Sequence, residues 1–341
     1  MADLTRLDAL PDGFLDCPAR ELHRLLAGPT LVELPGRRDA PLFVSVLQHG
    51  NEDTGLSAVQ QVLRAHAGKE LPRALMLMVG NVAAARQGQR RLDGQPDYNR
   101  VWPGAPDLSG TPEGRAMAEV HQRVLARGSF AAVDLHNNSG LNPHYGVVCS
   151  LDRDTLHLAA LFSRIAVWFT GLPGTQTASF AGRLPAITAE CGLPGVAANA
   201  EHAARFVEGM LHLDHFPAQP VHRQDLDLYH TLAVVKVRPE VGLSFGKEEA
   251  ELELDPALDH LNFRELPSGT RFGATSHEMP LEVVDEQGRD LAAEFFSTEG
   301  GELRLKRAAI PAMLSCNERI VRQDSLCYLM EHVPEGLEAF A

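Results

Sequence analysis

The stretch Leu42-Phe-Val-Ser-Val-Leu-Gln-His49-Gly-Asn-Glu52 decides how we expect this chain to fold. Residues 43–47 are mostly apolar or β-branched, which predicts a buried strand. Residues 54–66 then carry apolar side chains at helical spacing. His49 and Glu52 are therefore expected on the loop between a strand and a helix, where open α/β sheets bind ligands. Histidine and glutamate are also good Zn²⁺ ligands, so a metal site here would need one more ligand and a catalytic group.

The length and charge of the chain limit the classes of protein it can represent. Its 341 residues are enough for one large domain with an appendage, or for two domains. Lysine and arginine number 31 and aspartate and glutamate 45, which gives a net charge of 31 − 45 = −14. This acidity argues against nucleic acid and anionic membranes as main partners. A small anionic substrate stays compatible, because a few arginines can dominate one pocket.

Cysteine usage and hydropathy suggest a compartment. The five cysteines are scattered, odd in number and form no CxxC motif, so we expect reduced thiols in a cytoplasmic protein. The N-terminal residues lack the basic and apolar regions of a signal peptide. No stretch reaches ~18 apolar residues, so no membrane span is expected.

Strand and helix patterns alternate over residues 42–213. Strands are expected at 74–79, 130–136 and 183–190, and helices at 112–127, 156–169 and 199–213, after a helical lead-in at 1–27. This alternation predicts an α/β fold with a mixed, mainly parallel sheet flanked by helices. Beyond about residue 225 the pattern changes to short strands, at 232–237, 269–273, 281–284 and 303–305. We therefore expect an α/β catalytic domain over 1–220 and a smaller β-rich C-terminal domain over 221–341.

The segment 81–110 shows little periodicity and is rich in arginine, with Arg86, Arg90, Arg91 and Arg100. Loops of this length inside a compact domain are usually functional or disordered. The arginines favour a functional loop that faces an anionic substrate.

Three groups of polar side chains are expected at the carboxyl ends of three strands: His49 with Glu52, His136, and Glu190. Such strand ends meet at one edge of a parallel sheet. Two histidines and one carboxylate leave a fourth position open for water, as in catalytic zinc sites. Glu190 would then be free to take a proton from that water and give it to a leaving amine. Asp134, two residues before His136, either orients that ligand or makes a structural hydrogen bond.

Four motifs in order resemble the succinylglutamate desuccinylase/aspartoacylase family, a branch of the zinc carboxypeptidase-like fold. They are His49-Gly-Asn-Glu52, Asp97-Tyr-Asn-Arg-Val-Trp-Pro-Gly104, Asp134-Leu-His-Asn137 and Glu190-Cys-Gly192, and the resemblance covers about residues 30–215. It implies that His49, Glu52 and His136 hold one zinc ion per chain. It also implies that Glu190 is the general acid and base, that Asn99 and Arg100 hold a substrate carboxylate, and that Arg90 polarises the scissile carbonyl.

The chain departs from the family pattern at several positions. Tyr98 and Trp102 stand where the family usually has leucine and phenylalanine. Extra residues between Arg90 and Asn99 leave Arg91 as the alternative carbonyl-polarising group. The segment before Glu190 supplies no clear match for the family's further substrate-binding arginine, and Arg183 is the candidate stand-in.

The residues and the resemblance together predict a zinc-dependent hydrolase. Its expected substrate is a small, carboxylate-bearing N-acyl amino acid or related molecule with a linear amide bond. The alternative within the same chemistry is a zinc metallocarboxypeptidase that acts on peptides or cell-wall fragments. An alternative of another class is a non-catalytic binding module on the same fold. The sequence is compatible with a homo-oligomer.

Overall fold

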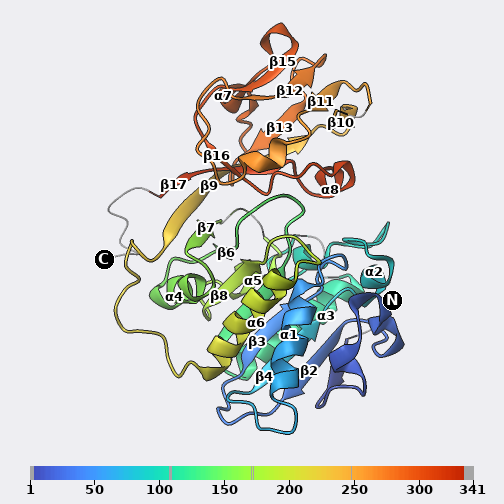
Figure 1. The fold of residues 1–341 in the computed structure, drawn as a ribbon, viewed down its shortest axis with the longest axis vertical. Helices are drawn as coiled ribbons and strands as arrows, with labels where there is room; N and C mark the ends of the chain where they lie inside the picture. The colour runs from blue at the N-terminus through green and yellow to red at the C-terminus, as the bar shows by residue number, and fades with distance from the viewer. Residues whose placement is uncertain (1–3, 107–109, 170, 172, 247, 334–341) are drawn as a thin grey trace. The chain divides into compact units, whose positions relative to one another are not determined.

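The structure is a computed structural model that describes residues 4–106, 110–169, 171, 173–246 and 248–333 (Figure 1). These residues form two compact units. The first contains residues up to 137 together with 144–227, and the second contains residues 138–143 and those from 228 onward. The predicted division into domains 1–220 and 221–341 stays a prediction. Among the described helices, none combines the length and the apolar character needed to cross a membrane.

The first unit is built on a mixed, mostly parallel sheet, as the alternation of patterns predicts. Along the sheet the strands are β1 (Thr5–Leu7), β2 (Thr30–Leu34), β4 (Leu75–Val79), β3 (Leu42–Val46), β5 (Ala131–His136), β8 (Ala186–Glu190), β6 (Tyr145–Val148) and β7 (Ile165–Trp168). Strands β3, β4, β5 and β8 pair in parallel, whereas β2 joins β4, and β6 joins β8, in antiparallel fashion.

Helices cover both faces of this sheet because the side chains of its strands alternate in direction. On one face, Phe43 of β3 packs with Met117 and Val120 of α3 (Pro112–Ala126). On the other face lies α1 (Thr54–Ala65), where a Cβ atom on Gly55 would be 3.2 Å from Val46 Cγ1. The helix α6 (Ala197–His212) packs against α1. The remaining helical segments are η1 (Phe14–Asp16), η2 (Ala19–Arg24), α2 (Val82–Gln87), η3 (Tyr98–Arg100), α4 (Arg153–Phe162) and α5 (Gln176–Phe180).

Several local predictions are wrong. The described part of the lead-in, residues 4–27, forms β1 and two short 3₁₀ helices instead of an α-helix, and α2 lies in the segment expected to lack structure. The helix expected over 156–169 ends at Phe162, and Ile165–Trp168 is the strand β7. Ser163 stops the helix, because its backbone is extended and its hydroxyl accepts a hydrogen bond from the Ile165 amide. The following β-branched residues then pair with β6.

The second unit is rich in β-structure, also as predicted. Its core contains Val235, Phe272, Phe295 and Leu329. One group of paired strands contains β9 (Asp227–Val237), β13 (Leu281–Val284), β16 (Ile310–Ala312) and β17 (Cys327–His332). A separate sheet contains β10 (Leu243–Ser244), β11 (Leu252–Leu254), β12 (Arg271–Thr275), β15 (Glu302–Leu305) and β14 (Phe296–Ser297). The short helices are η4 (Leu258–Leu261), α7 (Ala292–Phe295), η5 (Glu299–Gly301) and α8 (Glu318–Gln323).

Candidate active site

The loop between β3 and α1 carries His49 and Glu52, and close backbone packing fixes its shape. Leu47 turns the chain at the end of β3 with a φ of 56°, which is unusual for a residue other than glycine. Gly50 lies against α2 so closely that a Cβ atom would be 2.1 Å from the Ala85 nitrogen. The amide of Gly50 donates a hydrogen bond to the carbonyl of Arg90 at 3.1 Å. The loop therefore has room only for glycine at position 50, and it is tied to the segment that carries Arg90.

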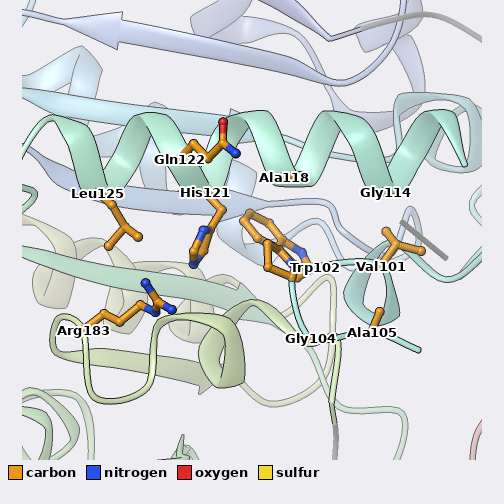
Figure 2. A pocket seen from close by; sticks show the side chains of 11 residues that line it. Val101, Trp102, Gly104, Ala105, Gly114, Ala118, His121, Gln122, Leu125 and Arg183 are labelled. Carbon is orange, nitrogen blue, oxygen red and sulfur yellow. The ribbon is translucent and has the colours of Figure 1, made fainter. Parts of the chain in front are cut away.

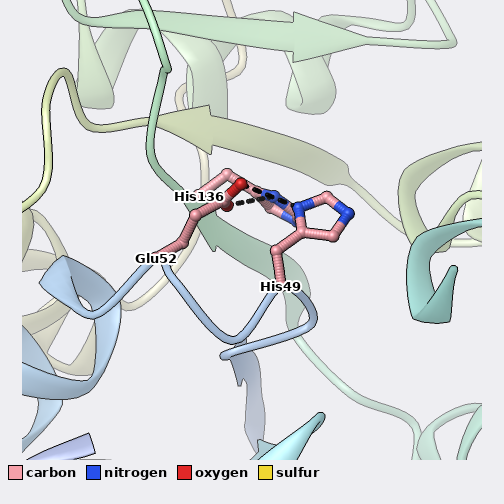
Figure 3. A group of neighbouring side chains, drawn as sticks. All are labelled: His49, Glu52 and His136. Atoms are coloured by element: carbon pink, nitrogen blue, oxygen red, sulfur yellow. Dashed lines mark hydrogen bonds and ion pairs between the residues drawn. The ribbon is translucent and has the colours of Figure 1, made fainter. Parts of the chain in front are cut away.

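His49, Glu52 and His136 converge at the carboxyl ends of β3 and β5 (Figure 3). The Nδ1 atom of His49 lies 2.8 Å from Oε1 of Glu52, and the Nδ1 atom of His136 lies 2.8 Å from Oε2. The three residues are only 3%, 6% and 4% exposed. Each ring thus directs the same nitrogen at one buried carboxylate, although the residues come from distant parts of the chain.

The other ring nitrogens face carboxylates as well. Nε2 of His49 lies 3.0 Å from Oδ1 of Asp97, and Nε2 of His136 lies 2.8 Å from Oδ2 of Asp134. If each histidine donates its Nε2 proton to its aspartate, both Nδ1 lone pairs face the oxygens of Glu52. Acceptors that face one another require a cation between them. The donor set and its outer carboxylates therefore fit a divalent metal ion, for which such aspartates fix the ring orientation.

Charge and burial compete at this cluster. Burial opposes ionisation of Glu52, but His49 and His136 bring the pKa of its carboxyl below the usual range. Burial likewise opposes protonation of His136, but Asp134 and Glu52 raise its pKa well above the ordinary value. In the metal-free protein, protons on the imidazoles thus balance the carboxylates. A metal ion would have to displace them, so its binding releases protons.

Glu190 ends β8 directly beside His136, because these two residues are paired in the register of β5 and β8. It is 4% exposed. Burial raises the pKa of Glu190 to about 8; His136 acts against this change and Glu52 adds to it. A carboxyl group with a pKa near neutrality can both accept and donate a proton, which is what general acid–base catalysis requires.

The two candidate arginines have different surroundings. Arg90 reaches Asp97 with Nη2 at 3.0 Å, and its Nη1 lies 3.7 Å from Oε1 of Glu52. The Nη1 atom of Arg91 instead donates to the backbone carbonyl of Gln95. The structure therefore brings Arg90 to the metal-ligand candidates, and it directs Arg91 into its own loop.

Asn99 and Arg100 lie on η3. The Nδ2 atom of Asn99 is 3.3 Å from Nε2 of His136, and its Oδ1 accepts a hydrogen bond from the amide of Gln176. Arg100 is partly exposed, and its Nη1 donates to the carbonyl of Asn99 at 2.8 Å. The motif thus places a buried amide beside a metal-ligand candidate and a guanidinium next to it.

Arg183 occupies a different environment. It lines a cavity of about 410 Å³ together with Trp102 and with His121 and Leu125 of α3 (Figure 2). The segment that follows η3 forms part of the cavity wall, and His49, Glu52 and His136 do not line it.

Asp97 and Gln48 are site residues to which the sequence assigned no role. Burial opposes ionisation of Asp97, but His49 and Arg90 hold its pKa well below the ordinary value. Gln48 donates to Asp134 at 2.7 Å and accepts a hydrogen bond from the indole nitrogen of Trp102. Asp97 is the first residue of the motif over residues 97–104, and this position in the motif is the sequence signal that could have identified it. Gln48 gave none, because a lone glutamine before a histidine carries no pattern.

Comparisons with known proteins place this geometry in context. Residues 41–213 match the family described as succinylglutamate desuccinylase/aspartoacylase catalytic domain. The succinylglutamate desuccinylase of Chromobacterium violaceum is similar in structure, with a TM-score of 0.59, 20% identity, and coverage of 90% of this chain and 89% of that one. Murine aminoacylase 3 is similar with a TM-score of 0.52 and 14% sequence identity, and the match covers 87% of this chain and 95% of that one. An ectoine utilization protein from Ruegeria pomeroyi, in a product-bound structure, is similar with a TM-score of 0.54 and 14% sequence identity. That match covers 89% of this chain and 88% of the other. No curated protein sequence matches the chain.

Proposed function

The chain belongs to the succinylglutamate desuccinylase/aspartoacylase family, and we propose on this premise that it is a zinc-dependent deacylase. Its substrate would be an N-acyl amino acid or a related small amide that bears a carboxylate. The observation that carries the proposal is the convergence of His49 Nδ1, His136 Nδ1 and both Glu52 oxygens, with Glu190 beside them in strand register. The names of the similar structures, desuccinylase and aminoacylase, support the same reaction class.

In this proposal, His49, Glu52 and His136 hold the zinc ion. When bound, zinc lowers the pKa of a water molecule and polarises the acyl carbonyl. Glu190 accepts the proton of the attacking water on its carboxylate and later delivers it to the nitrogen of the leaving amine. With a cation held by its neighbour His136, Glu190 would ionise more readily, because a nearby positive charge lowers the pKa of a carboxyl group.

The arginines divide two further tasks. The guanidinium of Arg90, next to Glu52, stabilises the negative charge that develops on the carbonyl oxygen in the transition state. Asn99 and Arg100 bind the substrate carboxylate, because a guanidinium can grip a carboxylate through two parallel hydrogen bonds. Holding the carboxylate fixes the amide bond relative to Glu190 and removes the entropic cost of orientation from the chemical step.

An amine-release screen tests the proposed function. The purified protein is incubated with N-succinyl, N-acetyl and other N-acyl amino acids, and with peptides of two or more residues. Each incubation is repeated with added zinc and with a chelator. We expect release of amine from at least one N-acyl amino acid, lost with the chelator and restored by zinc. Cleavage only of peptides longer than two residues would establish a carboxypeptidase instead. No turnover together with no bound metal would establish a binding module.

Replacing Arg90 separates its role from that of its neighbour. We expect Arg90→Ala to lower kcat/KM by roughly 10²- to 10³-fold, because it removes a donor to the developing oxyanion. Arg91→Ala is the matched control, and it should stay close to the wild-type value because Arg91 bonds to its own loop. Steady-state kinetics on the substrate found in the screen give both numbers. A larger loss for Arg91→Ala than for Arg90→Ala would reverse the assignment.

A further inference from the structure

A second group of two histidines and a glutamate lies outside the candidate active site, at the ends of α1 and α6. His66 caps the C-terminus of α1, and Glu208 and His212 are four residues apart on α6. Their ligand atoms all lie within 4.8 Å of one another. We propose that these three residues form a second transition-metal site, suited to Zn²⁺, that fastens α1 to α6.

The fold itself brings the three residues together. β3 and β8 run in the same direction because both pair in parallel with β5. α1 follows β3 and α6 follows β8, so each helix returns along the sheet and both end at the same edge. The two helices pack side by side (Figure 1). α1 has 12 residues, and at about 1.5 Å per residue it separates the second group from Glu52 by roughly 20 Å.

The second group, like the first, brings two imidazole nitrogens to one glutamate carboxylate. Nε2 of His66 lies 3.0 Å from each oxygen of Glu208, and Nε2 of His212 lies 3.0 Å from Oε1. The corresponding separation at His49 and Glu52 is 2.8 Å. Zinc bonds of about 2.0–2.1 Å in a tetrahedron place two donors roughly 3.3 Å apart, so small movements would admit the ion.

Two features distinguish this group from an ordinary surface ion pair. One oxygen of Glu208 faces two imidazole nitrogens, whereas an ion pair needs only one. The group is also held on rigid elements, because the His66 amide donates to the carbonyl of Val62 and the other two residues share one helix face. Imidazole and carboxylate donors favour zinc and related transition metals over Ca²⁺ and Mg²⁺.

The solvent exposure of the three side chains determines how tightly we expect this second site to hold its metal ion. The side chains of His66, Glu208 and His212 are 14%, 36% and 59% exposed. Solvent can therefore supply the remaining coordination positions, and zinc should exchange more readily here than at the buried site. Its consequence is structural, because metal that binds only the folded state stabilises the contact between the two helices.

Zinc titration of a protein that lacks the first site tests this proposal. His136→Ala removes a ligand of the buried site, so the metal-free variant should bind one equivalent of added Zn²⁺ and unfold at a higher temperature with zinc. Adding His212→Ala should reduce binding to background and abolish the zinc-dependent shift. His215→Ala, an exposed histidine just beyond α6, is the matched control and should leave both unchanged.

Stoichiometry in the otherwise unaltered chain provides a second route if His136→Ala does not fold. The wild-type protein should then bind two equivalents of Zn²⁺, and His212→Ala and Glu208→Gln should bind one. Equal stoichiometry for the wild type and His212→Ala would overturn the second site and would leave the deacylase proposal untouched. A loss caused equally by His215→Ala would also overturn it, because it would indicate nonspecific surface binding.

Discussion

The Glu190→Ala variant is expected to retain its zinc and to lose nearly all activity. We expect kcat to fall by roughly 10²- to 10⁴-fold, the usual contribution of a positioned general acid and base. The three proposed ligands are other residues, so metal content should stay at the wild-type level. Turnover on the substrate found in the screen, measured together with metal content, tests this. Near-normal turnover would show that Glu190 is not the proton carrier.

The pH dependence of the stability of the metal-free protein tests separately whether Glu190 carries a proton, and so distinguishes that role from a purely structural one. In the metal-free protein, the pKa of Glu190 is raised from the ordinary 4.5 to about 8. Folding therefore takes up a proton between these values, and the associated stability is full below pH 4.5 and is lost as pH rises toward 8. Glu190→Gln should lack this loss, so its stability relative to wild type should increase from pH 5 to pH 8. Glu201→Gln, at an exposed position on α6, should show no such change.

Removal of a metal ligand is expected to abolish activity by a different route. His136→Ala should lose the buried zinc ion, and its turnover should fall to the background rate, because the water molecule is no longer activated. Treatment of the wild type with a chelator should cause the same loss of activity. Added zinc should restore activity to the chelated wild type but not to His136→Ala. His222→Ala, at an exposed histidine, is the control and should keep its activity and metal. Full activity in metal-free His136→Ala would contradict a zinc mechanism.

The sequence predicts the sheet and the ends of its strands well, because buried strands of β-branched and apolar residues leave a strong pattern. His136 and Glu190 end such strands, and His49 and Glu52 lie on the loop after β3, so the sequence could predict that these side chains meet at one edge of the sheet. The short elements were missed for the opposite reason. β7 has four residues and follows a helix of similar composition, so helical spacing seemed to continue through it.

The choice between Arg90 and Arg91 shows what sequence spacing leaves undetermined. Two neighbouring arginines in a loop are equally good candidates for the carbonyl-polarising residue until the path of the backbone is known. Here the Gly50 amide binds the carbonyl of Arg90, and this contact joins two segments that are far apart in the chain. The role of Asp97 depends on the same backbone path. Asp97 contacts His49 and Arg90 only because the folded loop brings all three side chains together.

The pairing of His136 with Glu190 in β5 and β8 has a consequence for how this chain can be monitored. Alternate residues of a strand face opposite sides of a sheet, so a slip of one residue would send one of these side chains to the wrong face. A molecule with that error would keep an apolar interior and yet separate the proposed proton carrier, Glu190, from the proposed metal ligand, His136. In the deacylase that we propose, specific activity per zinc ion bound at the buried site should therefore report the fraction of molecules whose central strands are correctly aligned, which spectroscopic secondary-structure content would not reveal.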